Sequence, residues 1–164
     1  MDFVSIIMGS KSDYKIMCEC IEVLKQFKVP YEVLIASAHR SPDRAKTYIK
    51  EAEKKGAKVF IGAAGMAAHL AGAIASMTTK PVIGVPLSGG ALDGLDALLS
   101  TVQMPSGMPV GTLAIGKAGA INAAYLAIQI LALNNTELAL ALQEDRQHKL
   151  HKLEADSKEI EHFI

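Results

Sequence analysis

Five short segments rich in glycine and polar residues carry the side chains that could do chemistry in this sequence. Each segment follows an apolar run about as long as a strand. Ligands of parallel α/β sheets bind beyond the carboxyl ends of the strands, so we expect these segments to meet in one site. They are GSKSD at 9–13, SAHRSP at 37–42, GAAGMAAH at 62–69, PLSGG at 86–90 and GKAG at 116–119.

The first two segments suit a phosphorylated sugar. Ser10 and Ser12 supply hydroxyl groups close to a helix N-terminus, whose free amides favour an anion. Arg40 adds a planar guanidinium that matches phosphate. Asp13 would repel phosphate but accepts hydrogen bonds from a sugar diol. Two simpler interpretations stay open: Asp13 only caps the next helix, and Arg40 is an ordinary surface arginine.

Two histidines lie in these segments. His39 stands in an irregular stretch between Ala38 and Arg40, where its side chain could transfer protons near neutral pH. A histidine in such a loop could equally be incidental. His69 follows a turn rich in glycine and alanine, and we expect it to be buried and hydrogen-bonded rather than catalytic.

Other kinds of site lack their sequence patterns. The chain has no GxxxxGK motif followed by Ser or Thr, no GxGxxG and no GxSxG, so loops for ATP or dinucleotides and a serine nucleophile elbow are not indicated. The run GAAGMAAHLAG at 62–72 is glycine-rich but has the wrong spacing. Neither His39 nor His69 has a second ligand at metal-binding spacing. We therefore expect no metal and no cofactor.

The elements that position these segments alternate between strands and helices, which predicts an α/β fold whose parallel sheet is covered on both faces. The helix over 42–55 has the clearest ends, with Ser41 as its expected cap, Pro42 at its first position and Gly56 closing it. Strands are predicted at 3–8, 31–36, 58–63, 82–85 and 110–115, and the other helices at 14–27, 67–77, 92–100 and 118–133.

Length and composition limit the class of protein. The 164 residues suffice for one domain, 1–164, and the net charge of zero gives no general attraction for nucleic acid or a membrane. The apolar run at 3–8 is too short for a signal peptide, and the one at 118–133 is too short to span a membrane. Cys18 and Cys20 point in different directions on a helix and pair with nothing. These features predict a reduced, cytoplasmic protein.

Charge is scarce in the middle of the chain. Residues 57–133 include five charged side chains, whereas average composition would give roughly 19. We interpret this stretch as surface buried between subunits of a homo-oligomer, although a solvent face of small neutral residues is the alternative. The segment 136–164 is a charged amphipathic helix, which is either the last layer of its own domain or, as we favour, an arm that packs on a neighbouring subunit.

Taken together and in order, these segments resemble the N5-carboxyaminoimidazole ribonucleotide mutase family of bacterial purine biosynthesis. The resemblance covers about residues 3–133. The chain departs from the usual family pattern at Met66, Ala71, Ser41 and Ala97. The matching motifs are MGSKSD, SAHRSPDR, GMAAHLAG, PVIGVP and STVQMPSGMPVGTLAIGKAGAINAA.

The resemblance implies a three-layer α/β/α, flavodoxin-like subunit that forms an octamer with active sites at subunit interfaces. It implies that the carboxylate moves from the exocyclic nitrogen of the substrate to ring carbon C4 without ATP, metal or organic cofactor. His39 matches the general acid and base of the family. The ribonucleotide-binding positions are Ser10, Asp13 and Arg40, with Ser12 and Ser37 close by, and Gly65, Ala67, Ala68, His69 and Leu70 match the pocket for the base and carboxylate.

Two other functions stay open. A sister branch of the family carboxylates aminoimidazole ribonucleotide directly with carbon dioxide, but it tends to have Lys after the histidine and a different loop at 65–72. Arg40 and the AAHLAG motif at 67–72 therefore favour the mutase. A non-catalytic, flavodoxin-like module that binds a phosphorylated metabolite would explain the serines and Arg40 but would give His39 no role.

Overall fold

The central sheet contains five parallel strands in the order β2-β1-β3-β4-β5. The computed structural model describes residues 1–161. The strands are β1 (Phe3–Met8), β2 (Tyr31–Ile35), β3 (Ala57–Gly65), β4 (Val82–Leu87) and β5 (Gly111–Thr112). This is the strand order of flavodoxin-like folds, in which ligands bind where the order reverses, between β1 and β3. The predicted fold class is confirmed.

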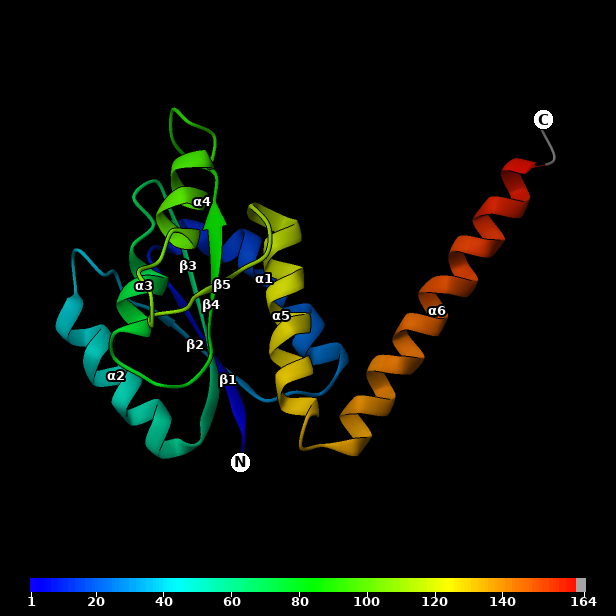
Figure 1. Cartoon of the computed structure of the whole chain (residues 1–164), viewed down its shortest axis with the longest axis horizontal. Coiled ribbons are helices and arrows are strands. Elements are labelled where there is room, and N and C mark those ends of the chain that lie inside the picture. The colour runs from blue at the N-terminus through cyan, green and yellow to red at the C-terminus, as the bar shows by residue number, and fades with distance from the viewer. Residues whose placement is uncertain (162–164) are drawn as a thin grey trace. The chain divides into compact units, whose positions relative to one another are not determined.

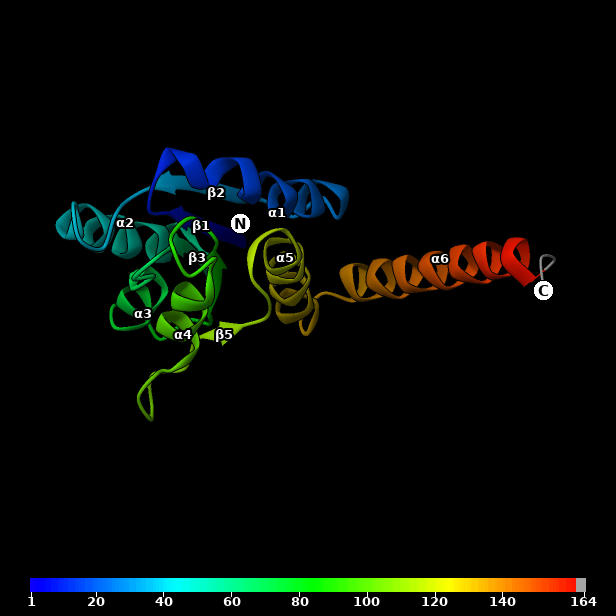
Figure 2. The ribbon, with the colours of Figure 1, turned by 90° about the horizontal axis from the view of Figure 1, so that it is seen from above.

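Helices cover both faces of this sheet (Figure 1). Seen from above, α2, α3 and α4 lie on one face and α1 and α5 lie on the other (Figure 2). An ion pair of 2.8 Å between Lys117 and Glu19 and an edge-to-face contact between the rings of Phe27 and Tyr125 join α5 to α1. The helices are the 3₁₀ turn η1 (Lys11–Asp13), α1 (Tyr14–Gln26), α2 (Pro42–Lys55), α3 (Leu70–Ala75), α4 (Leu95–Val102), α5 (Gly116–Ala132) and α6 (Thr136–Glu161).

The strands form the core because they are apolar on both sides. Every residue of β1 and of β4 is buried, as continuous apolar strands between two helical layers must be. Helix α3 packs directly on β3 at Gly62, where an added Cβ would lie 3.0 Å from the Cα of Ala71. This close approach fixes the position of the N-terminal end of α3 relative to the sheet.

The ends of α2 agree with the sequence prediction, apart from its cap. The helix begins at Pro42 and ends at Gly56, whose φ of 113° is in the left-handed region that glycine tolerates. Ser41 is the N-cap residue, but its side chain makes no capping hydrogen bond. Its hydroxyl instead accepts a hydrogen bond of 2.9 Å from the backbone N–H of Ser37, so it closes the turn that carries His39 and Arg40.

Three predicted elements are shorter than expected. Helix α3 begins at Leu70 rather than 67 because Met66 has a φ of 52°, which breaks the helical path. Helix α4 begins at Leu95 rather than 92 because Asp93 and Gly94 are both left-handed. Strand β5 keeps two of the six predicted residues, since pairing to β4 is limited to Gly111 and Thr112.

Residues 1–128 form one compact unit, and the described residues from Gln129 onward form a second. The second unit contains α6, which ends at Glu161; positions 162–164 of the helix predicted over 136–164 lie outside the described residues. Within α6, Leu138 is buried, whereas Leu150 and Leu153 are exposed. Among the helices of residues 1–161, none is both long and apolar enough to cross a membrane.

Candidate active site

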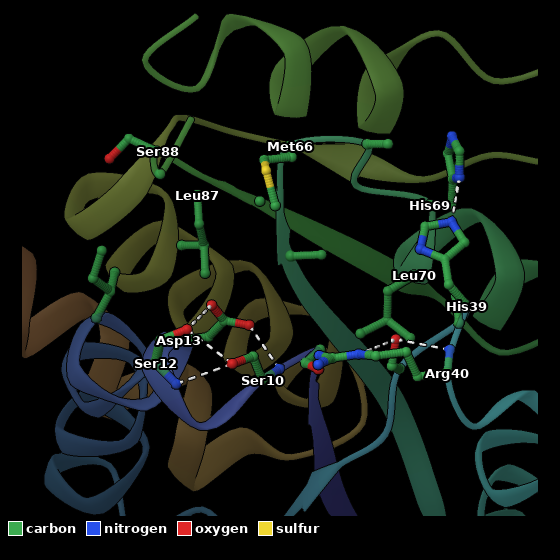
Figure 3. Close-up of a pocket in the computed structure, with 18 residues that line it drawn as sticks. Ser10, Ser12, Asp13, His39, Arg40, Met66, His69, Leu70, Leu87 and Ser88 are labelled. Carbon is green, nitrogen blue, oxygen red and sulfur yellow. Dashed lines mark hydrogen bonds between the residues drawn. The ribbon is translucent and has the colours of Figure 1, made fainter. Parts of the chain in front are cut away.

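A cavity of about 610 Å³ opens at the carboxyl ends of the strands, at the place where the sheet order reverses. It is lined by the loops after β1, β2, β3 and β4 (Figure 3). Among the described residues, Ala68 is buried and is not part of this lining. The cavity brings together the other site residues that the sequence predicts: Ser10, Ser12, Asp13, Ser37, His39, Arg40, Gly65, Ala67, His69 and Leu70.

Hydrogen bonds between its own residues stabilise the turn after β1. The backbone N–H of Ser10 donates to the Oδ2 atom of Asp13 at 3.0 Å, and the Ser10 hydroxyl accepts from the N–H of Ser12 at 3.2 Å. This is a capping box at the start of η1. Asp13 makes no side-chain cap to α1. The turn therefore caps the N-terminus of η1 and also presents hydroxyl and carboxylate groups to the cavity.

Burial raises the pKa of Asp13, although hydrogen bonds from Ser10 and Ser12 and the nearby charge of Arg40 act in the opposite direction. A raised pKa means that the folded protein binds a proton at Asp13 more tightly than the unfolded chain does. The stabilisation from this group is thus present below its ordinary pKa and is lost as the pH rises through the raised value. At neutral pH the fold keeps a half-buried carboxylate at some cost in stability, which is typical of a functional group.

Arg40 joins two loops of the site. Its Nη2 group donates to the carbonyl oxygen of Gly9 at 2.9 Å, and its backbone N–H donates to the Ser37 hydroxyl at 3.2 Å. The guanidinium therefore reaches from the loop after β2 to the loop after β1. These contacts occupy few of its five N–H donors, so others stay available for an anion.

His39 and His69 contact each other on one side of the cavity (Figure 3). The Nε2 atom of His39 lies 2.7 Å from the Nδ1 atom of His69, and the two rings meet edge to face. The expectation that His69 is hydrogen-bonded is confirmed, but the expectation that it is buried is wrong. Because α3 begins only at Leu70, His69 lies at the rim of the cavity rather than inside the helix packing.

Residues 3–152 match the family described as AIR carboxylase. The chain belongs to this family. Among residues 1–161 there is no group of three or more His, Cys, Asp or Glu side chains placed to hold a metal ion. The site of this family member thus offers hydroxyl, carboxylate and guanidinium groups at one end and a pair of imidazoles at the other.

Curated relatives of this family member carry one name. The chain is 51% identical to the N5-carboxyaminoimidazole ribonucleotide mutase of Pyrococcus horikoshii over 96% of this chain and 88% of the relative. It is 56% identical to the mutase of Saccharolobus solfataricus, over 85% and 87% of the two chains, and 52% identical to that of Escherichia coli K12, over 88% and 85%. The predicted resemblance to the mutase family is confirmed.

A solved structure shares the whole fold. The crystal structure of Treponema denticola PurE matches with a TM-score of 0.88 at 26% sequence identity, covering 98% of this chain and 99% of that one.

Several lining residues were not selected from the sequence. They are mostly small or apolar: Gly9, Ile16, Ala38, Ala64, Met66, Leu87, Ser88 and Gly89. The segment PLSGG did indicate that the loop after β4 forms a wall, but its residue types do not distinguish cavity lining from core. Met66 and Leu87 give the cavity an apolar side that faces the charged groups of Asp13 and Arg40 (Figure 3).

Met66 is a strained member of this apolar wall. It has a φ of 52°, and the residue is 59% exposed. Left-handed backbone costs a residue with a Cβ about 1–2 kcal/mol. We therefore expect Met66→Gly to raise the free energy of unfolding by about 1 kcal/mol, measured by thermal or denaturant unfolding.

The matched control is Ala67→Gly, one residue further on. Ala67 is also exposed but does not have a positive φ, so glycine there should lower stability by roughly 0.5–1 kcal/mol through greater entropy of the unfolded chain. Equal destabilisation by both substitutions would show that Met66 bears no strain.

Proposed function

We propose that this chain is an N5-carboxyaminoimidazole ribonucleotide mutase, an isomerase that converts this carbamate to 4-carboxy-5-aminoimidazole ribonucleotide in purine biosynthesis. The observation that carries the proposal is one cavity that combines Ser10, Asp13 and Arg40 with the His39–His69 pair. The chain that forms this cavity is more than half identical to curated mutases.

Each wall of the cavity has a role in this reaction. The hydroxyl groups of Ser10, Ser12 and Ser37 and the guanidinium of Arg40 bind the ribonucleotide phosphate. Asp13 accepts hydrogen bonds from the ribose hydroxyls. The residues after β3 that line the cavity, namely Gly65, Ala67, His69 and Leu70, form the pocket for the base and carboxylate.

The reaction requires one proton to be donated to the substrate and one proton to be removed from it. His39 protonates the carbamate nitrogen, the bond from this nitrogen to the carboxylate breaks, and carbon dioxide is released beside the ring. Carbon C4 then attacks the carbon dioxide, and His39 removes the proton from C4. The apolar wall formed by Leu70 and Leu87 suits this step, because a pocket with little water holds carbon dioxide close to C4. Substrate and product are isomers, so no ATP is consumed.

A direct test distinguishes the mutase from its alternatives. The pure protein is incubated with the carbamate, and separately with aminoimidazole ribonucleotide and bicarbonate, both without ATP. Rapid interconversion of the carbamate and the C4 carboxylate supports the mutase. Product formed only in the second incubation would identify a direct carboxylase, and turnover in neither would leave a binding module.

We propose further that the chain forms a homo-octamer with active sites at subunit interfaces. Support comes from an apolar stripe along one side of α4, where Leu95, Leu99 and Val102 are each more than 40% exposed, and from the exposed Leu92 in the loop just before this helix. Exposed leucines at this spacing are typical of a helix face that another chain covers. The scarcity of charge over 57–133 fits the same interpretation. Helix α6 would then pack on a neighbouring subunit.

Light scattering tests the assembly. We expect a mass of eight times the 17.4 kDa of one chain at micromolar concentration. The double variant Leu95→Glu, Leu99→Glu should give smaller species because it places charges in the buried contact. Lys50→Glu, on the exposed face of α2, is the matched control and should leave the octamer intact. A monomeric wild-type protein would refute this assembly.

A further inference from the structure

The rings of His39 and His69 are hydrogen-bonded to each other. Two imidazole nitrogens 2.7 Å apart can share only one proton, so one ring must donate and the other must accept. No carboxylate in the part of the chain that the structure describes hydrogen-bonds to either ring. Each ring is therefore oriented by the other ring.

The reaction decides which ring donates. To give a proton to the carbamate nitrogen and remain neutral afterwards, His39 must begin as an imidazolium with a proton on both nitrogens. Its Nε2–H then points at His69, which must present a lone pair on Nδ1 and carry its own proton on Nε2. A protonated Nδ1 on His69 would face the Nε2–H of His39 at 2.7 Å, and the two would repel each other.

We propose that His69 is a positioning residue for His39: it accepts a hydrogen bond from Nε2 of His39 through its own Nδ1, and so leaves Nδ1 of His39 as the nitrogen that exchanges protons with the substrate. This inference rests on the proposed function. Within residues 1–161, no protein group is hydrogen-bonded to Nδ1 of His39, so that nitrogen is available.

The protonation states balance over the whole cycle. The imidazolium of His39 gives its Nδ1 proton to the substrate nitrogen as the bond to carbon dioxide breaks. The neutral ring then has a lone pair on Nδ1 and still donates from Nε2 to His69. When C4 has bonded to carbon dioxide, Nδ1 takes the C4 proton and the starting state returns. His69 stays neutral throughout and exchanges no proton with the substrate.

The structure also explains why His69 suits this role. It lies directly before α3, and its backbone carbonyl accepts from the N–H of Ala73 at 2.9 Å. Helix α3 is held close to the sheet by the contact of Ala71 with Gly62. The Nδ1 atom therefore projects from a fixed backbone position, whereas within residues 1–161 the ring of His39 has no hydrogen bond other than the one to His69.

Two substitutions of His69 separate a positioning role from other roles. In His69→Asn the side-chain amide occupies the place of Nδ1 and its oxygen accepts the same hydrogen bond. In His69→Phe the ring remains but the acceptor is lost. We expect His69→Phe to lower kcat by about 10- to 100-fold, by analogy with the loss of hydrogen-bond partners that orient metal-bound histidines, with KM within about threefold. His69→Asn should restore kcat to within about fivefold of wild type.

The controls make each outcome decisive. His148→Asn, an exposed histidine on α6, should behave as wild type, and thermal unfolding and light scattering verify that every variant is folded and assembled. The inference is overturned if His69→Phe keeps its kcat, if it raises KM instead, or if His69→Asn is as impaired as His69→Phe. An inactive wild-type protein would instead count against the proposed function itself.

Discussion

Replacing His39 with asparagine should abolish turnover while substrate binding persists. A single acid–base group usually contributes roughly 10²- to 10⁴-fold to a rate. Here one group serves both the release and the capture of carbon dioxide, so we expect His39→Asn to lose more than that range. Asparagine keeps polarity and part of the shape, and His39 is exposed at the rim of the cavity, so the fold and the assembly should be retained.

Ligand binding is the control that distinguishes a role of His39 in the chemistry from a role in the structure of its loop. A variant that binds the ribonucleotide with nearly wild-type affinity but does not turn over assigns His39 to the chemistry. A variant that fails to bind assigns it to the structure of the loop. If His39→Asn kept a tenth or more of the wild-type turnover while His69→Asn abolished it, the roles of the two histidines would be the reverse of those proposed.

The parts of the site that could be predicted from the sequence share one physical reason. Ser10, Asp13, His39 and Arg40 are polar residues that directly follow apolar strands, and the carboxyl ends of parallel strands meet at one edge of the sheet. The apolar runs that mark the strands and the geometry of a parallel sheet were therefore enough to predict that these residues lie together.

The position of His69 could not be obtained in this way. Whether it is buried depends on where α3 begins, and that depends on Met66 adopting a left-handed conformation that its residue type disfavours. The start of α4 was missed for the same reason at Asp93. A glycine in a sequence often indicates a residue with left-handed backbone, whereas the residue types methionine and aspartate gave no such indication at Met66 and Asp93.

The apolar wall was missed for a different reason. Leu87 and Ser88 lie at the end of a strand whose residues are all buried, and nothing in the sequence marks where core ends and cavity begins. The boundary is set by the loop after β4 and by the strands on either side, which are distant in sequence. Only the assembled sheet shows it.

Arg40→Ala should weaken ribonucleotide binding by about 1.5–3 kcal/mol, the usual value of a hydrogen bond to a charged group. This corresponds to a rise in Kd of roughly 10- to 150-fold. Arg40→Lys should recover only part of the loss, because an ammonium group cannot bind two phosphate oxygens in a fork. Titration calorimetry with the ribonucleotide would measure both.

The second contact of Arg40 must be separated from its role toward phosphate. The guanidinium also donates to Gly9, so its loss could loosen the turn that carries Ser10 and Asp13. The ribonucleoside that lacks the phosphate separates the two effects: a direct phosphate contact predicts that Arg40→Ala binds this nucleoside as wild type does, whereas a loosened turn would weaken the nucleoside as well, because it displaces Asp13. Arg44→Ala, exposed on the first turn of α2 and outside the cavity, is the matched control and should bind as wild type. Unchanged affinity in Arg40→Ala would mean that other donors in the cavity bind the phosphate.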